Sequence, residues 1–332
     1  MKRLGIIGWG YWGRNYAKYF DSNLDAQLAE VCDLRQDMLD DARRLYPHLK
    51  ITKDVKEFIR HKLDGVIIAS PASMHFSLAK TFIEAGIPVL VEKPLTDSLP
   101  TAIALEKFAA KHKAKVLVGH TFLYNQSVRF LKKEIDKGTL GKLHYLEFRR
   151  QSYGPVRDDV NVIWDFAPHD LAISRYLLGD SFPITVNAHA GKFSRNGLED
   201  IAVMTLMYPN NVMVNINVAW LYPVKIRALT ILGDKKMAVF EDTNANEPVK
   251  ICDTSIQYPK ENDPTGASFR LGDIRIPSIA PIDPLATQLK HFVSYIKGIE
   301  KPLTPIEDGV AIVKILDAIE RSIHTGREVN MK

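Results

Sequence analysis

Short apolar segments alternate with segments of helical spacing over the first 120 residues. The apolar segments cover 3–7, 26–32, 65–69, 89–91 and 116–118, and helical spacing covers 15–20, 36–45, 55–60, 73–85 and 99–112. Strands that are apolar on both faces are typical of a parallel sheet covered by helices, with right-handed crossovers between the strands. This part of the chain is therefore predicted to be a doubly wound α/β domain.

The pattern changes after residue 121. A helical segment at 127–137 is followed by alternating segments typical of strands, and one further helix is predicted at about 168–178, with Pro168 in its first turn. The predicted strands lie at 142–151, 184–193, 201–208, 212–219, 227–232 and 237–241. Short turns at 209–211 and 233–235 join them, which favours a large, open antiparallel sheet and an α+β domain.

The last third of the chain is less regular. Residues 253–284 are rich in Pro, Asp and Gly and have weak periodicity, so we expect a structureless lid, binding loop or arm there. Two helices are predicted near 285–297 and 306–325, either in the second domain or packed back on the first. The predicted domains are 1–121 and 122–332.

Composition excludes several classes of protein. The chain has 332 residues, 46% of them hydrophobic and 25% charged, which is typical of a soluble two-domain enzyme. The net charge of +5 is compatible with an anionic ligand such as a cofactor phosphate or a sugar nucleotide, but it is too scattered for nucleic acid. Two cysteines, with no segment that resembles a signal peptide or a membrane span, predict a reducing cytoplasm and no disulfide framework.

The clearest motif follows the first predicted strand. Gly8, Gly10 and Gly13 match G-x-G-x-x-G, and the motif opens a helix, as a dinucleotide-binding turn requires. In this motif the first glycine makes the turn, the second lets the backbone approach a pyrophosphate, and the third lets helix and strand pack closely. The motif predicts a Rossmann domain, and the alternative is a tight turn that binds nothing.

An acidic residue ends the second predicted strand. Asp33 lies twenty residues after Gly13, where a carboxylate that binds the ribose of NAD is expected, and it would repel the phosphate of NADP. NADP is therefore the less favoured cofactor, although Arg35 would soften the repulsion. The alternative role for Asp33 is to cap the next helix.

Three aromatic residues give the glycine-rich turn unusual bulk. Trp9, Tyr11 and Trp12 are either packing residues or a wall beside the nicotinamide or the substrate.

Two further groups carry candidate chemistry. Lys93, in Glu92-Lys93-Pro94, follows a predicted strand, so it is either a surface lysine or a group that polarises a substrate oxygen. Asp165 and His169 are four residues apart and share one helix face, which suits a general base oriented by a carboxylate. The alternative is a capping pair. A zinc site is not expected, because no nearby cluster supplies the other ligands.

Taken in order, these motifs resemble the glucose–fructose oxidoreductase / inositol dehydrogenase (Gfo/Idh/MocA) family over essentially the whole chain. The series consists of the glycine motif, Ser70-Pro71-Ala72-Ser73-Met74-His75, Glu92-Lys93-Pro94, Gly119-His120 and Asp165-x-x-x-His169. Members of this family use NAD or NADP, act mostly on sugars, sugar nucleotides and cyclitols, and often pair through the C-terminal sheet. A homodimer or homotetramer formed through that sheet is therefore expected, with no nucleic-acid or membrane partner.

The resemblance also implies roles for individual residues. Lys93, Asp165 and His169 would form the catalytic set. Ser70, Pro71 and His75 would lie along the nicotinamide, with Glu92 and Lys93 close to it. Two segments that should border the substrate depart from the commoner family pattern, and their candidate substrate-binding residues are His120, Tyr124, Asn125 and Trp164. With these departures, the chain resembles family members of nucleotide-sugar biosynthesis, including those that oxidise UDP-N-acetylglucosamine at C3.

The sequence therefore predicts an NAD-dependent dehydrogenase that oxidises a secondary alcohol of a sugar or nucleotide sugar. His169 would accept the hydroxyl proton, Asp165 would orient His169, and Lys93 would stabilise the alkoxide, while hydride passes to the nicotinamide. One alternative is a ketosugar or cyclitol reductase, because no residue reports the direction of the reaction. The other is a non-catalytic, NAD-binding regulatory protein of the same fold.

Overall fold

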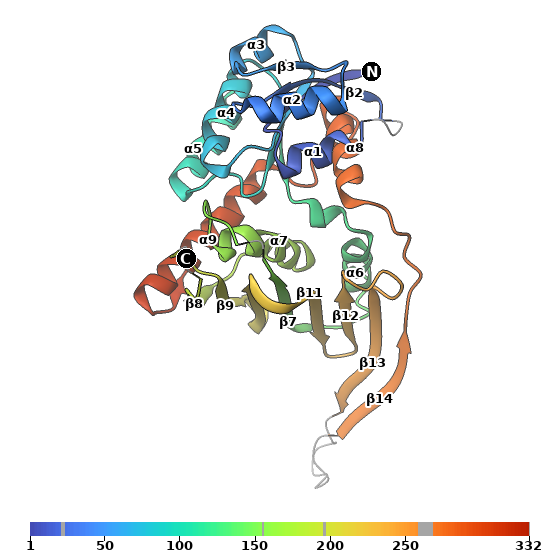
Figure 1. Cartoon of the computed structure of the whole chain (residues 1–332). Helices are drawn as coiled ribbons and strands as arrows, with labels where there is room; N and C mark the ends of the chain where they lie inside the picture. Colours follow the sequence, from blue (N-terminus) through green and yellow to red (C-terminus); the bar gives the residue numbers. More distant parts are fainter. Residues whose placement is uncertain (21–23, 155, 195–196, 258–267, 332) are drawn as a thin grey trace. The chain divides into compact units, whose positions relative to one another are not determined.

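The computed structural model contains two compact units. It describes residues 1–20, 24–154, 156–194, 197–257 and 268–331 (Figure 1). Unit 1 consists of Met1–Tyr124 and Asp283–Lys314, and unit 2 of Asn125–Ile282 and Ile315–Lys332. Among the described helices, none is long and apolar enough to cross a membrane.

Unit 1 is built on a six-stranded sheet whose strands are all parallel, in the order β3-β2-β1-β4-β5-β6. The strands are β1 (Lys2–Ile7), β2 (Ala26–Cys32), β3 (Lys50–Thr52), β4 (Gly65–Ile68), β5 (Val89–Glu92) and β6 (Val116–Gly119). This order is that of the doubly wound dinucleotide-binding fold, so the predicted fold class of the first domain is confirmed. The sequence pattern missed β3, because three residues are too few to show a periodicity.

Helices connect the strands of unit 1. They are α1 (Tyr11–Ala17), α2 (Gln36–Leu45), α3 (Val55–Arg60), α4 (Ala72–Glu84) and α5 (Leu99–Lys111), with a short 3₁₀ turn at Thr121–Tyr124. The helix α8 (Pro284–Ile296) also belongs to this unit although it comes late in the chain.

The helix α8 is part of the hydrophobic core of unit 1. Leu289 and Phe292 are fully buried in the same cluster as Leu4 of β1. Asp283 caps the helix by accepting the N–H of Leu285 at 2.8 Å, and the Tyr19 hydroxyl donates to the same carboxylate at 2.6 Å. The structure thus divides the chain differently from the expected ranges 1–121 and 122–332, because the apolar face of α8 is buried against unit 1.

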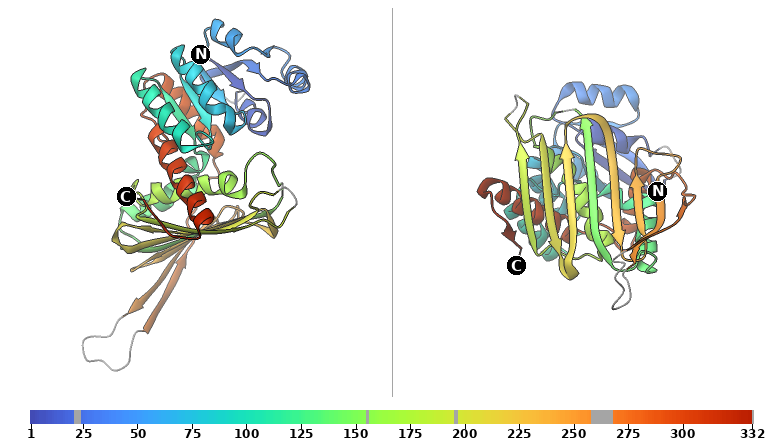
Figure 2. Two further views of the ribbon diagram at one scale, coloured as in Figure 1. Left: turned by 90° about the vertical axis from the view of Figure 1, so that its left-hand side faces the viewer. Right: turned by 90° about the horizontal axis from the view of Figure 1, so that it is seen from below.

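Unit 2 is built on a nine-stranded sheet in the order β14-β13-β12-β11-β7-β10-β9-β8-β15. The strands are β7 (Leu143–Tyr153), β8 (Thr185–Gly191), β9 (Ile201–Tyr208), β10 (Val212–Ala219), β11 (Leu221–Gly233), β12 (Met237–Glu241), β13 (Val249–Gln257), β14 (Ser268–Arg275) and β15 (Val329–Asn330). The sheet is antiparallel, as predicted, except that β7 and β10 pair in parallel. Helix α7 (Val162–Leu177) packs on β7, β9 and β10, and the other face of the sheet is seen in the right-hand view of Figure 2.

The expectation of a structureless stretch at 253–284 is wrong in part. The strands β13 and β14 form an antiparallel pair, with Cys252 opposite Ile274 and Thr254 opposite Leu271. The strand β13 is also paired with β12, and this pairing explains why a segment of weak periodicity is nevertheless a strand. The tip of the predicted loop, 258–267, lies outside the described residues.

Helix α7 begins six residues earlier than expected, so Pro168 lies inside the helix and not in its first turn. The Asn161 side chain caps the helix and accepts the N–H of Trp164 at 3.1 Å. Proline has no N–H for the carbonyl four residues before it, which is why its position had suggested a helix start. The other helices that reach unit 2 are α6 (Gln126–Asp136) and the end of α9 (Ile306–Thr325).

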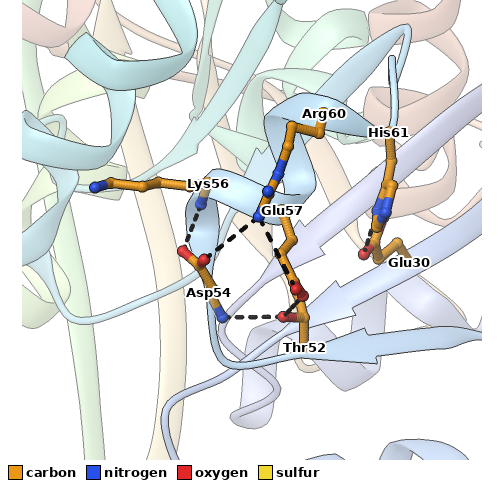
Figure 3. Close-up of polar contacts among 7 residues, drawn as sticks. All are labelled: Glu30, Thr52, Asp54, Lys56, Glu57, Arg60 and His61. Atoms are coloured by element: carbon orange, nitrogen blue, oxygen red, sulfur yellow. Dashed lines mark hydrogen bonds and ion pairs between the residues drawn. The ribbon is translucent and has the colours of Figure 1, made fainter.

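A polar cluster links β2, β3 and α3 in unit 1 (Figure 3). Glu30 of β2 is buried, and its Oε2 lies 2.8 Å from Nδ1 of His61. Beside this pair, Thr52 donates to Glu57 at 2.6 Å and accepts the N–H of Asp54 at 3.0 Å. The His61 imidazole is the hydrogen-bond partner of the buried Glu30 carboxylate, and burial of that carboxylate would be costly without a partner.

We expect His61→Ala to lower the free energy of unfolding by about 1–3 kcal/mol, because it leaves the Glu30 carboxylate buried without the imidazole. Urea unfolding followed by tryptophan fluorescence measures the change. His48→Ala is the matched control, since His48 is exposed, and Glu30→Gln combined with His61→Ala should recover part of the loss. Equal free energies of unfolding for His61→Ala and His48→Ala would contradict the role assigned to His61.

Candidate functional site

The three glycines of the turn between β1 and α1 have different physical roles. Gly8 has φ +91°, and a Cβ there would lie 2.7 Å from the carbonyl oxygen of Ala69. A Cβ on Gly13 would lie 2.0 Å from the carbonyl oxygen of Gly8, whereas a Cβ on Gly10 would meet nothing within 4 Å. The fold therefore requires the first and third glycines. The second leaves the backbone open to an incoming phosphate, as dinucleotide binding demands.

Asp33 follows β2 and is held by two backbone N–H groups. Its Oδ2 accepts the N–H of Trp9 at 2.7 Å, and its Oδ1 accepts the N–H of Arg35 at 2.9 Å. These bonds fix the carboxylate next to the glycine-rich turn, where it suits a ribose. The alternative role does not hold, because the N-cap of α2 is Arg35 and not Asp33.

The aromatic residues of the turn separate into two kinds. Trp9 is fully buried, stands edge-on to Tyr46 at 5.9 Å and donates its indole N–H to Asp41 at 3.0 Å. These contacts fit the packing interpretation of Trp9. Tyr11 is 75% exposed and stands edge-on to the half-buried Trp12, which packs against the core. Tyr11 and Trp12 remain predicted cofactor contacts.

His75 of α4 links the loops that follow β4 and β5. The ring is buried, with Nδ1 2.9 Å from the carbonyl oxygen of Pro94 and Nε2 2.9 Å from that of Ser70. Burial lowers the pKa of His75, and the two carbonyl oxygens oppose that shift. The ring thus lies between the backbones of both loops, which carry the predicted cofactor residues Ser70, Pro71 and Lys93. In its neutral form its one N–H donates to one of the two carbonyl oxygens.

Glu92, at the end of β5, supports the neighbouring lysine. The carboxylate is buried, and its two oxygens accept the Tyr16 hydroxyl at 2.7 Å and the backbone N–H of Lys93 at 3.0 Å. Burial raises the pKa of Glu92. Burial also raises the pKa of Tyr16, and the neighbouring Glu92 raises it further. Glu92 therefore fixes the backbone at Lys93, a largely buried lysine at the carboxyl end of a parallel strand.

In unit 2, Asp165 and His169 lie on α7, four residues apart and on the same face of the helix. His169 is buried. Both oxygens of Asp165 have donors, since Oδ1 lies 3.4 Å from Nη1 of Arg157 and Oδ2 lies 3.2 Å from Nε1 of Trp220. Sequence reasoning missed Arg157 and Trp220, because neither stands at a motif spacing from Asp165. The one available sign was that Trp220 directly follows a predicted strand.

The predicted substrate-binding residues have partners within their own units. Tyr124 is fully buried, and its hydroxyl lies 2.8 Å from Nδ1 of His291. Asn125 caps α6 by accepting the N–H of Ser127 at 2.8 Å. These contacts position both side chains, and their contact with a substrate stays a prediction.

The other two predicted substrate residues are His120 and Trp164. His120 is buried, and Trp164 donates its indole N–H to Glu320 at 3.0 Å. Their contact with a substrate stays a prediction. Over the described residues, no group of three or more His, Cys, Asp or Glu side chains is arranged to hold a metal ion.

The six-stranded parallel sheet, its glycine-rich first turn and the aspartate after β2 together define an NAD-binding oxidoreductase domain. Residues 2–120 match the family model described as "Oxidoreductase family, NAD-binding Rossmann fold". Residues 128–239 match the "GFO/IDH/MocA C-terminal domain". The chain belongs to the Gfo/Idh/MocA family of oxidoreductases.

Named relatives extend over much or all of the chain. Myo-inositol 2-dehydrogenase of Thermotoga maritima is 24% identical, with 99% of this chain and 98% of the relative covered. UDP-N-acetylglucosamine 3-dehydrogenase of Acidithiobacillus ferrooxidans is 26% identical over 73% of this chain and 74% of its own length. The solved structure of GenD2 from gentamicin A biosynthesis, in complex with NAD, has a TM-score of 0.84 and 22% identity, covering 100% of this chain and 96% of GenD2.

We expect Gly10→Ala to weaken NAD binding at least tenfold with little change in melting temperature, because its methyl group has space in the protein but occupies the approach of the pyrophosphate. Isothermal titration calorimetry with NAD⁺ measures the affinity. Gly13→Ala is the contrasting variant, and it should lower the melting temperature because its Cβ collides with a backbone oxygen. Wild-type NAD affinity in Gly10→Ala would contradict the assignment.

Proposed function

We propose that this oxidoreductase transfers hydride between NAD and a secondary alcohol or ketone on a sugar, cyclitol or nucleotide-sugar ring. The observation that carries the proposal is the pair Asp165 and His169 on one face of α7, with both oxygens of Asp165 bonded to donors. Lys93, whose backbone is fixed by Glu92, supplies the cation. A protein that only binds NAD needs neither a general base nor a buried lysine.

Each residue of this set has a distinct task in the proposed reaction. A ring nitrogen of His169 accepts the proton of the substrate hydroxyl, and the anionic Asp165 orients the ring and stabilises the imidazolium. The ammonium group of Lys93 stabilises the negative charge that develops on the substrate oxygen. NAD, held at the glycine-rich turn and Asp33, accepts the hydride at C4 of its nicotinamide.

The relatives support a polyhydroxylated ring as the substrate. One is named for myo-inositol and another for UDP-N-acetylglucosamine, so oxidation of a UDP-N-acetylhexosamine at C3 is the more specific form of the proposal. A ketosugar or cyclitol reductase uses the same residues in reverse. We place the protein in a reducing cytoplasm, which is supported by its two cysteines, both free thiols in the structure.

The proposed reaction is tested by NADH absorbance with myo-inositol, UDP-N-acetylglucosamine and their keto forms as substrates. We expect Lys93→Met and His169→Ala each to lower kcat by 10²–10⁴, the usual contribution of a positioned acid or base. Lys80→Met and His189→Ala are matched controls, because both side chains are exposed. Loss of less than tenfold in His169→Ala would refute its role as the base.

We also propose that two copies pair through the open face of the nine-stranded sheet. Strand register supports this, because directly paired residues share a face and one apolar row of them extends over seven of the nine strands, from β14 to β9. The row consists of Ile274, Cys252, Met237, Leu232, Tyr145, Met213 and Met207. All are partly or largely exposed, and an apolar row of this length favours a protein partner over water.

Replacing Met213 and Met237 together by Asp should halve the mass of the particle in solution, because each charge would be buried against a second copy. Light scattering after size exclusion gives the mass. Lys80→Asp, on the exposed side of α4, is the control and should leave the mass unchanged. A wild-type monomer, or an unchanged mass in the double variant, would rule out pairing through this face.

A further inference from the structure

Trp220 lies at the junction between β10 and β11, where both its side chain and its backbone have partners. The side chain is fully buried, and its ring stands edge-on to Phe166 at 6.5 Å. The backbone of Trp220 is also held, since its N–H donates to the carbonyl oxygen of Asp200 at 2.9 Å and its own carbonyl accepts the N–H of Gly154 at 2.8 Å. The indole N–H is therefore a fixed donor.

That donor is directed at Asp165, with Nε1 3.2 Å from Oδ2. An indole N–H can only donate, so its partner must be an acceptor. A carboxylate anion is a stronger acceptor than a neutral oxygen. On the other side of the same carboxylate, Nη1 of Arg157 lies 3.4 Å from Oδ1. Arg157 is itself held by Asp159, to which it donates at 2.8 and 2.7 Å.

We propose that Trp220 is a positioning residue that holds Asp165 as an oriented anion, with Arg157 as its counterpart on the second oxygen. This inference rests on the proposed function, in which Asp165 acts on His169. Two donors from outside α7, one on each oxygen, fix the plane of the carboxylate. Asp165 then serves as a fixed charge beside the base and not as a proton donor. Trp220 acts only through it.

The contact itself can be tested without a substrate. The chain has four tryptophans, so the indole region of a ¹H–¹⁵N spectrum of the whole protein holds few signals. Trp220→Phe assigns one of them, and in Asp165→Asn that signal should move, because the acceptor is no longer an anion. The Trp9 signal is the internal control, since that indole donates to Asp41 in unit 1. A Trp220 signal unchanged by Asp165→Asn would overturn the proposal.

The effect on catalysis is tested with whichever of myo-inositol or UDP-N-acetylglucosamine is turned over. Trp220→Phe keeps the ring but removes the N–H, and it should lower kcat/KM about tenfold, the size expected for one hydrogen bond to a charged group. The KM for NAD should not change.

Two further variants separate positioning from general damage. In an Asp165→Asn background, Trp220→Phe should cause no additional loss, because its effect passes through the carboxylate. Tyr208→Phe is the matched control, since it removes a different buried contact to α7, 3.3 Å from the Ser174 hydroxyl, and should leave kcat/KM near the wild-type value. Additive losses in the double variant, or a kcat/KM in Trp220→Phe that matches wild type, would overturn the proposal. Absence of turnover in the wild type would instead refute the proposed function and leave the spectroscopic test intact.

Discussion

A carboxylate that leaves bulk water needs a hydrogen-bond donor for each oxygen, and the candidate chemistry of this protein depends on that constraint. Asp33 meets it with the backbone N–H groups of Trp9 and Arg35. Glu92 meets it with Tyr16 and the N–H of Lys93. Asp165 meets it in the same way, with one donor on each oxygen. In each case the bonds fix the carboxyl group and, with it, the segment that carries a candidate functional residue.

The parts of this arrangement that are local in sequence were predictable. The spacing of the glycines, the position of Asp33 twenty residues after Gly13 and the helical spacing of Asp165 and His169 all follow from the chain itself. The donors to Asp165 were not predictable, because Trp220 reaches it only after the sheet has formed. Such a contact leaves no periodicity in the sequence.

The same reason explains the differences in the fold. The strand β13 has too weak an alternation to be recognised alone, and it is ordered by its pairing with β12. Helix α8 is recognisable as a helix, but only its buried face shows that it belongs to unit 1. The sequence leaves Trp9 open between packing and a wall beside the ligand, and its buried ring and the bond from its indole N–H to Asp41 favour packing.

Deuterium transfer tests the central claim, hydride exchange with a polyhydroxylated ring, most directly. The protein is incubated with NAD⁺ and with myo-inositol or UDP-N-acetylglucosamine deuterated at the ring carbons, and the nicotinamide product is analysed by mass spectrometry. The account predicts NADH that carries one deuterium, formed 10²–10⁴ times more slowly by His169→Ala. Tight NAD⁺ binding with no deuterium in the nicotinamide from either ring would contradict it and favour a protein that binds NAD without catalysis.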